Sequence, residues 1–129
     1  MRWRDFFLAC LSLIYDNKSM KTYTLKQTVE FKKWAKKLDA QTRARIYFRA
    51  DTACVTGNFG DHHGVGGGVN EMRFHFAHGF RVYYTIWRDQ VVLLLLGGDK
   101  SGQSADIAQA RKMLPKVLAQ LEQEEKNGK

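Results

Sequence analysis

Hydrophobic and polar side chains alternate through the segment 69–87, and this period of two residues predicts β-strands. In a first run at 70–76, Met and Phe alternate with ionisable residues, so a strand would carry apolar groups on one face and charged groups on the other. A second run at 80–86 alternates in the same way after a short, glycine-containing turn at 77–79. The two runs predict a hairpin with one charged face. The ionisable residues of the first run are Glu71, Arg73 and His75.

A third run at 91–96 is almost entirely aliphatic. Strands that are buried on both faces have this composition, so the run predicts an interior strand of an antiparallel sheet, reached through a turn at 87–90. The run ends at 97–100 in the sequence Gly-Gly-Asp-Lys. A lysine therefore emerges at the end of the most buried strand, where a rigid scaffold can hold it open to a partner.

Two helices are predicted before the sheet. Alternation at 21–28 indicates a first strand, and Thr28 then precedes apolar residues spaced i, i+3, i+4 and i+7, which form one face of a helix. Asp39 is placed to cap a second helix from 40 to about 56. Because only one or two residues separate the helices, we expect a helical hairpin packed on the sheet. The apolar residues of the first helix are Phe31, Trp34, Ala35 and Leu38.

The segment 57–68 is rich in glycine and predicts a mobile connector. It does not match a phosphate-binding loop, because GxxxxGK[ST] is absent and Val69 stands where the last glycine of GxGxxG should be. After the sheet, Ser104 is placed as an N-cap, and apolar residues recur at helical spacing from 107 to 121. Pro115 is expected to kink or split that helix.

The chain has 129 residues and a formal net charge of +8, from 21 Lys and Arg against 13 Asp and Glu. This length suits one domain with its own core. A basic protein attracts anionic surfaces, so nucleic acid is the leading class of partner. No run approaches the ~18 apolar residues that a membrane span requires, so no membrane partner is expected.

The potential metal ligands are poorly arranged for a metal site. Cys10 and Cys54 are the only cysteines, and neither has the spacing of zinc ligands, which fits a reducing cytoplasm. His62 and His63 are adjacent, so in a strand they would point to opposite sides, and no carboxylate or cysteine is spaced to complete a site. We therefore expect neither a metal nor another cofactor.

Residues 1–19 differ in composition from the rest. Two arginines precede a short apolar run that resembles a weak signal peptide, but no cleavage site follows it. A simpler interpretation makes Met20 the natural start and the earlier residues an upstream extension. The predicted domain is then 20–121, followed by a polar tail at 122–129 that is expected to fray.

Five short motifs follow one another along the chain: Phe31-x-x-Trp34, Gly57-Asn58-x-Gly60-Asp61, Gly68-Val69-x-Glu71-Met72-Arg73, Gly79-Phe80-Arg81-Val82-Tyr83-Tyr84 and Gly97-Gly98-Asp99-Lys100-x-x-Gln103-x-x-Asp106-Ile107. In this order and spacing they resemble the RelE/ParE superfamily of type II toxin-antitoxin toxins, most closely the HigB-like group of addiction module killer proteins. The resemblance implies an α+β fold, in which an N-terminal strand and a helical hairpin pack on a small antiparallel sheet with a C-terminal helix.

Proteins of this group are small and basic, and they cut messenger RNA, typically in the ribosomal A site. The resemblance therefore implies a metal-independent endoribonuclease, an mRNA interferase that inhibits translation. It implies mRNA and the ribosome as partners, together with a cognate antitoxin, a small DNA-binding protein encoded beside the toxin. Attack by a ribose 2′-hydroxyl on the adjacent phosphate needs a proton acceptor, stabilisation of the anionic phosphorane and a proton donor.

Five residues become candidates for the catalytic groups. By the resemblance, Arg81 stabilises the phosphate, a role that suits a guanidinium because it binds phosphate in bidentate fashion and stays charged. Arg73 falls where the family keeps a basic residue on the preceding strand, and Lys100 falls in a region that supplies another cationic or acid group. His75 is the leading candidate proton carrier, because histidine titrates near neutral pH, and Glu71 is a second candidate base. Some RelE members have a basic residue at the Glu71 position, and no C-terminal tyrosine aligns, so the acid and base stay open.

Further RNA contacts are expected from side chains around this group, each with an alternative. The lysines of the first helix could track phosphates or simply form a solvated face. Tyr83 could pack as readily as stack on a base. Arg73 and Arg81 could instead be surface arginines paired with Glu71 and Asp99. The candidate RNA-binding residues are Lys32, Lys33, Lys36, Lys37, Arg45, Tyr83, Asp99 and Gln103.

Two other functions stay open. A ParE-like protein would bind DNA gyrase and have no nuclease activity, and a degenerate member would retain only antitoxin binding. In every case the antitoxin is expected to dock on the cationic sheet, on the last helix, or on both.

Overall fold

The computed structural model describes residues 22–128, so the expectations for 1–19 and for Met20 as the natural start lie outside the described part. Along the chain there follow a strand, two helices, four strands, a short 3-10 helix and a long helix. These elements are β1 (Thr24–Gln27), α2 (Val29–Lys36), α3 (Ala40–Thr56), β2 (His62–Gly64), β3 (Asn70–Arg73), β4 (Phe80–Trp87), β5 (Val91–Asp99), η2 (Lys100–Gly102) and α4 (Gln103–Asn127).

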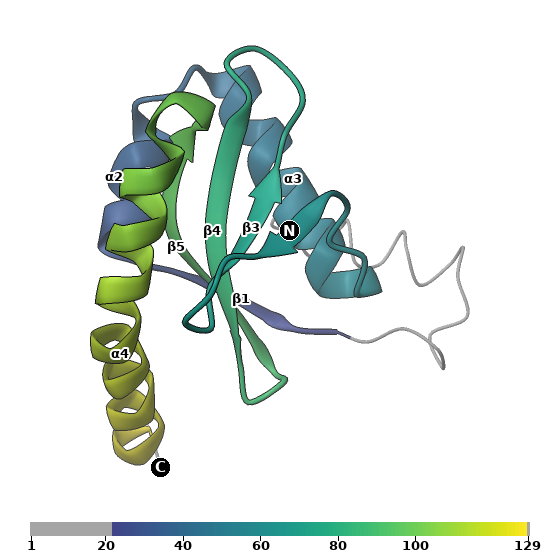
Figure 1. Cartoon of the computed structure of the whole chain (residues 1–129). Coiled ribbons are helices and arrows are strands. Elements are labelled where there is room, and N and C mark those ends of the chain that lie inside the picture. Colours follow the sequence, from purple (N-terminus) through teal and green to yellow (C-terminus); the bar gives the residue numbers. More distant parts are fainter. Residues whose placement is uncertain (1–21, 129) are drawn as a thin grey trace, which may run out of the picture.

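The five strands form one sheet in the order β1-β5-β4-β3-β2. The strands from β2 to β5 pair antiparallel, whereas β1 pairs parallel with β5 at the far edge. Figure 1 shows α3 behind the strands and α4 along the side of the sheet next to β5. The predicted α+β fold is confirmed, and its first strand adds a parallel edge to the antiparallel sheet.

Each face of the sheet packs against its own helices. One face is covered by the helical hairpin, through buried residues such as Phe31 of α2 and Ile46 of α3. The other is covered by α4, through buried residues such as Ala110 and Leu114. These surfaces of the sheet are called the hairpin face and the α4 face below. Strand β5 buries alternate residues in both cores, which confirms the interior strand predicted at 91–96.

The starts of both N-terminal helices follow from their capping residues. The hydroxyl of Thr28 accepts a hydrogen bond from Phe31 N at 3.0 Å. A carboxylate oxygen of Asp39 accepts one from Thr42 N at 2.9 Å. Each cap satisfies a backbone N–H that has no partner within its own helix. The predicted hairpin of two helices is confirmed.

The segment 57–68 was wrongly predicted to be only a connector. It contains β2, which pairs with β3 and forms the outer edge of the sheet. The glycines hide this strand, because a three-residue strand is too short to show an alternating pattern.

The last helix also differs from its prediction. It begins after Gly102 without a side-chain cap rather than at Ser104, it continues through Pro115, and it includes most of the polar tail. Packing of its apolar face on the sheet outweighs the backbone hydrogen bond that a proline removes. Across residues 22–128, no helix has the length and hydrophobicity needed to cross a bilayer.

Candidate functional site

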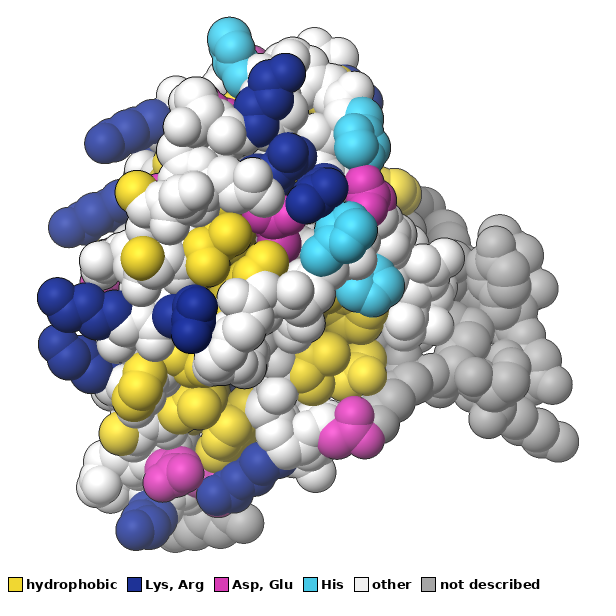
Figure 2. Space-filling model, in the orientation of Figure 1, with side chains coloured by type: hydrophobic (Ala, Val, Ile, Leu, Met, Phe, Trp, Pro, Cys, Tyr) yellow, Lys and Arg dark blue, Asp and Glu magenta, His cyan; other side chains and the backbone are white. Residues whose placement is uncertain are grey.

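On the α4 face, ionisable side chains form two neighbouring rows that run across the strands, one through Arg73 and the other through Glu71. The strand register places Arg73 of β3 opposite Arg81 of β4, and Glu71 opposite Tyr83. On the other side of β3, His63 of β2 lies opposite Glu71. Directly opposite residues in antiparallel strands share a face, so the two predicted arginines lie side by side. Figure 2 shows basic, acidic and histidine side chains gathered in the upper part of the molecule, over β3 and β4.

Glu71 lies at the centre of these rows and has no exposed surface. Arg73 Nε donates a hydrogen bond to Glu71 Oε1 at 2.7 Å, and Gln103 Nε2 of α4 donates one to Oε2 at 2.7 Å. Arg81 Nε lies 3.9 Å from Oε2. The Nη atoms of the two arginines make no hydrogen bond to any residue of 22–128. Glu71 therefore holds the guanidinium of Arg73 by a hydrogen bond and that of Arg81 by a longer ion pair, and Arg81 Nε has no hydrogen-bond partner among the described residues. The Arg73 side chain is 33% exposed and the Arg81 side chain 12% exposed, so an anion has more access to Arg73.

The charge of Glu71 is fixed by its neighbours. Burial by itself would raise the pKa of Glu71, but the hydrogen bonds from Arg73 and Gln103 and the charges of Arg73 and Arg81 lower it overall. The hydrogen bond to Glu71 in turn raises the pKa of Arg73. A buried carboxylate with a lowered pKa and a hydrogen bond to each oxygen is poorly suited to accept a proton from substrate. In this structure Glu71 contacts the side chains of Arg73 and Gln103, and its predicted role as a base stays a prediction.

Tyr83 lies beneath the start of α4 and is fully buried. Its hydroxyl makes no hydrogen bond with any of the described residues. Burial raises the pKa of Tyr83, and the nearby charges of Glu71 and Asp106 raise it further. Burial also raises the pKa of Asp106, in the first turn of α4, and the charge of Asp99 adds to this effect. Because its ring is enclosed, Tyr83 packs in the core and cannot stack on a base in this structure.

The predicted residues at the end of β5 have separate surroundings. The backbone N–H of Lys100 donates to the carbonyl of Gly79 at 3.1 Å, which fixes the end of β5 beside the β3–β4 loop. Arg81 pairs with the β5 residue two positions before Lys100, so this lysine lies just beyond the arginine pair. Asp99 accepts a hydrogen bond from Ser101 N at 2.9 Å and caps η2. Among the described residues, the Lys100 ammonium has no ion-pair partner.

His75 forms a cluster with two residues that the sequence did not single out as site residues. Its Nε2 atom lies 2.5 Å from Asp61 Oδ2, and His63 Nε2 lies 3.0 Å from Asp61 Oδ1. The carbonyl of Asp61 accepts a hydrogen bond from Arg73 N at 2.9 Å, which places the cluster beside the arginine pair. The hydrogen bond from His75 lowers the pKa of Asp61; burial opposes this effect, and the hydrogen bond from His63 adds to it. Recognising a strand at 62–64 would have revealed the cluster.

The other predicted RNA contacts belong to the hairpin face. The lysines of α2 are exposed on a helix that packs on that face, so the structure does not bring them beside the arginine pair. Arg45 of α3 holds its guanidinium 3.7 Å from the centre of the Phe76 ring. Their roles in RNA binding stay predictions. The α2 lysines are Lys32, Lys33 and Lys36, with Lys37 at the C-cap.

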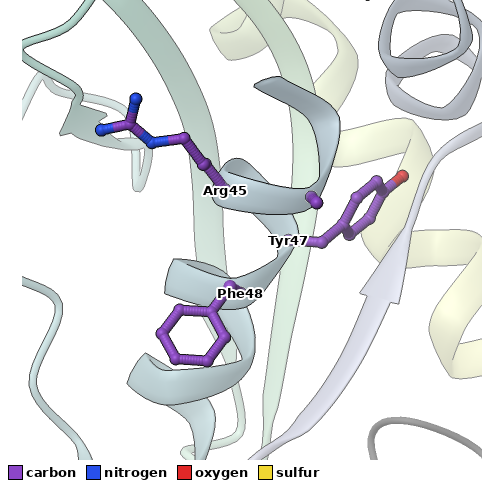
Figure 3. Close-up of a pocket in the computed structure, with 4 residues that line it drawn as sticks. Arg45, Tyr47 and Phe48 are labelled. Atoms are coloured by element: carbon purple, nitrogen blue, oxygen red, sulfur yellow. The ribbon is translucent and has the colours of Figure 1, made fainter. Parts of the chain in front are cut away.

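Two hollows border Arg45. Ala44, Arg45, Tyr47 and Phe48 form the described lining of a hollow of about 560 Å³ on α3. Figure 3 shows the side chains of Arg45 and Tyr47 projecting to different sides of this helix. A smaller hollow of about 280 Å³ lies between α3 and the β3–β4 loop, so Arg45 and His75 line one space. The lining of this smaller hollow is Arg45, Arg49, Phe74, His75 and Phe76.

Comparison with known proteins identifies the family. Residues 33–123 match the family described as phage derived protein Gp49-like (DUF891). The chain belongs to the Gp49-like family. An uncharacterized protein of Haemophilus influenzae is 40% identical to this Gp49-like protein over 100 residues, which are 77% of this chain and 95% of that protein.

The Gp49-like chain also resembles solved structures of toxins. Its TM-score is 0.55 with a mutant of the E. coli toxin RelE in the free state, in which two arginines are replaced by alanine; identity is 14%, over 70% of this chain and 94% of that one. The TM-score is 0.51 with a chain of the intact E. coli RelBE toxin-antitoxin complex, at 15% identity over 60% of this chain and 96% of that one. The RelE-like fold predicted from the motifs is confirmed.

Proposed function

We propose that this Gp49-like protein is the toxin of a type II toxin-antitoxin system and that it cleaves mRNA on the ribosome. The observation that carries the proposal is the pair formed by Arg73 and Arg81, side by side on one face of a RelE-like sheet and oriented by the buried Glu71. Such a pair presents two fixed positive charges to one phosphate. A net charge of +8 suits a polyanionic substrate.

The arginine pair would stabilise the phosphorane that forms when the 2′-oxygen attacks the adjacent phosphorus. In this reaction a bond forms between O2′ and phosphorus, and the bond from phosphorus to O5′ breaks. The products carry a 2′,3′-cyclic phosphate and a 5′-hydroxyl. Because the guanidinium groups are preorganised by Glu71, they need little rearrangement as charge develops on the phosphate oxygens. Lys100, just beyond the pair, would add a third positive charge.

The reaction also requires one group that takes the 2′-hydroxyl proton and one that delivers a proton to O5′. Arginine is unsuited to either step because it stays protonated. His75 is exposed beside Arg73 and is the predicted residue whose type and position suit proton transfer.

A cognate antitoxin is the expected protein partner. Support comes from the fold, because one of the similar structures is a toxin-antitoxin complex. The α4 face and α4 itself are the expected docking surfaces. Gln103 links α4 to the arginine pair, because its side chain donates a hydrogen bond to the carboxylate of Glu71, which lies beside both arginines.

Expression in bacteria tests the proposal directly. We expect induction to stop growth and translation, and primer extension on cellular transcripts to show cuts within translated regions. Arg81→Ala should relieve the arrest. A matched control is Arg88→Ala in the β4–β5 turn, where the arginine stacks on Trp87 at 4.3 Å and pairs with Glu125. That variant should stay toxic.

Two outcomes would overturn the nuclease assignment. Growth arrest with DNA damage and intact transcripts would indicate gyrase poisoning without nuclease activity. Absence of any arrest, with the antitoxin still bound, would indicate a degenerate member.

A further inference from the structure

Three side chains form a compact cluster at the β2 edge of the α4 face. Asp61 binds one imidazole with each of its two carboxylate oxygens, His75 at 2.5 Å and His63 at 3.0 Å. Both contacts are made by Nε2. Within residues 22–128 the Nδ1 atoms of these two rings have no hydrogen-bond partner, so each ring keeps one nitrogen for a ligand.

The cluster stands next to the arginine pair because of the strand register. His62 pairs with Met72, and the Arg73 N–H bonds the Asp61 carbonyl at 2.9 Å, so Asp61 and Arg73 are directly opposite. Opposite residues in an antiparallel pair have Cβ atoms about 5 Å apart. A phosphate held by Arg73 therefore lies within reach of imidazoles tethered to Asp61.

Charged groups face the cluster from two elements. From β3, Arg73 contributes a positive charge and Glu71 lies opposite His63. From α3, Arg49 donates to the carbonyls of Asp61 and Phe59, and Arg45 and Arg49 both line the hollow that His75 borders. The surroundings are mostly cationic. Asp61 is the anionic group that contacts both imidazoles.

We propose that His63 and His75 are the acid and base of the RNA cleavage, and that Asp61 is the positioning residue that holds both. This inference rests on the proposed function and deepens it. One imidazole, neutral, takes the proton from the 2′-hydroxyl as O2′ bonds to phosphorus. The other, protonated, gives its proton to O5′ as the bond from phosphorus to O5′ breaks. The two rings end with their protonation states exchanged, and solvent restores them.

The sequence pattern alone does not reveal this pair. His63 lies in the glycine-rich segment and His75 lies beyond a turn, 12 positions later. Only the pairing of β2 with β3 brings them to one carboxylate.

Single-turnover cleavage on ribosomes tests the assignment. The substrate is a short mRNA that wild-type protein cuts at one mapped phosphate, assayed across pH 5 to 9. We expect a bell-shaped dependence of rate on pH for the wild type. His63→Gln and His75→Gln should each lower the rate by about 10²- to 10³-fold and each abolish one limb of the bell. Asp61→Asn should lower the rate and shift both limbs.

The matched control is His62→Gln, because His62 is the adjacent residue on β2, points to the other side and contacts the Gly60 carbonyl and the Phe59 ring. It should keep the wild-type rate and profile. Thermal unfolding of each variant separates lost folding from lost chemistry.

A chemical rescue then assigns the roles. When the scissile O5′ is replaced by sulfur, the leaving group no longer needs a proton. Cleavage of this mRNA should be restored in the histidine variant that lacks the acid and in that variant only. Rescue of both variants or of neither, or folded variants with the wild-type profile, would overturn the two-histidine assignment. Failure of the wild type to cut any mRNA would instead overturn the proposed function.

Discussion

A single buried carboxylate lies between the arginines of the candidate site. Glu71 has no contact with solvent, yet it stays ionised because Arg73 and Gln103 donate to its two oxygens and Arg81 adds a positive charge. Removing one partner of a buried ion pair leaves the others without compensation, which costs more than an exposed pair is worth.

We expect Glu71→Gln to lower the free energy of unfolding by about 2 kcal/mol, because two guanidinium groups then lose their anionic partner. Urea unfolding measures this change. The matched control is Glu122→Gln at an exposed position of α4, which should have little effect. Equal stability of the two variants would show that the carboxylate is not needed to hold the arginines.

Arg81 could act through its positive charge alone or also through the planar shape of its guanidinium, and a lysine substitution separates the two. Lysine keeps the positive charge but lacks the planar fork that binds phosphate through two nitrogens. We expect Arg81→Lys to cut mRNA on ribosomes about tenfold more slowly than the wild type, and Arg81→Ala about 10²- to 10³-fold more slowly. Equal rates for the lysine variant and the wild type would reduce the role of Arg81 to a point charge.

At the scale of elements, β5 sets the distances between the two helical layers. Its glycines lie where helices approach the sheet: a Cβ at Gly97 would overlap the ring of Trp34 in α2, and a Cβ at Gly98 would overlap the carboxylate of Asp106 in α4. Small residues at the end of this strand therefore let α2 and α4 pack closely on opposite faces.

We expect Gly97→Ala to destabilise the fold by about 2 kcal/mol, because the Trp34 ring must move out of its packed position. Gly64→Ala on β2 is the matched control. A Cβ there meets only Asn70 Oδ1, at 3.8 Å. Urea unfolding compares the two variants, and comparable stabilities would show that α2 can shift without cost.

The sequence predicted those elements whose signals are local. Thr28 and Asp39 mark the helix starts because capping depends on neighbouring residues, and β5 is visible because continuous apolar sequence reflects burial on both faces. Non-local pairing was not predictable in the same way. The strand at 62–64 exists through its partner β3, and α4 passes Pro115 because the sheet holds its apolar face.

The candidate site shows the same division. Alternation placed Glu71, Arg73 and His75 on one face, and the motif placed Arg81 beside them. The burial of Glu71 and Tyr83 depends on the cover provided by α4, and the contact of His75 with Asp61 depends on β2. Both arise from tertiary packing that no local pattern encodes.

At the scale of the whole molecule, lowered carboxyl pKa values make stability depend on pH. Hydrogen bonds lower the pKa of Asp61 and Asp99, and those from Arg73 and Gln103 lower that of Glu71 against its burial. A carboxyl with a lowered pKa in the folded state stabilises above its unfolded pKa, near 4, and this stability is lost as pH falls.

We therefore expect the free energy of unfolding to fall between about pH 5 and pH 3, and the fall to be shallower in Glu71→Gln. Asp106 acts in the opposite sense, because its raised pKa favours folding when it is protonated. Urea unfolding at several pH values measures the slope of the unfolding free energy against pH for the wild type and for Glu71→Gln. An identical acid slope in wild type and Glu71→Gln would show that Glu71 is not a main source of the pH dependence.

Two groups of basic side chains lie on separate surfaces of the described part of the chain, and these can serve two ligands. The arginine pair lies on the α4 face, and the α2 lysines lie on a helix that covers the hairpin face. Because the two groups belong to opposite faces of the sheet, we expect a short single-stranded RNA to occupy the arginine pair alone, whereas a ribosome is large enough to contact both surfaces. Salt dependence distinguishes the contacts, because each phosphate contact to single-stranded RNA adds about 0.7 to the slope of log affinity against log salt.

We expect Arg81→Gln to reduce that slope by about 0.7 for a five-nucleotide RNA, and replacement of Lys32, Lys33 and Lys36 by glutamine to leave it unchanged. On ribosomes the same lysine variant should bind more weakly than the wild type, and the difference should shrink at high salt, because the lysines then face ribosomal RNA. Fluorescence anisotropy measures the first affinity and sedimentation with ribosomes the second. If the lysine variant lost affinity for the short RNA as well, one RNA would contact both surfaces at once, and the assignment of the two surfaces to separate ligands would be wrong.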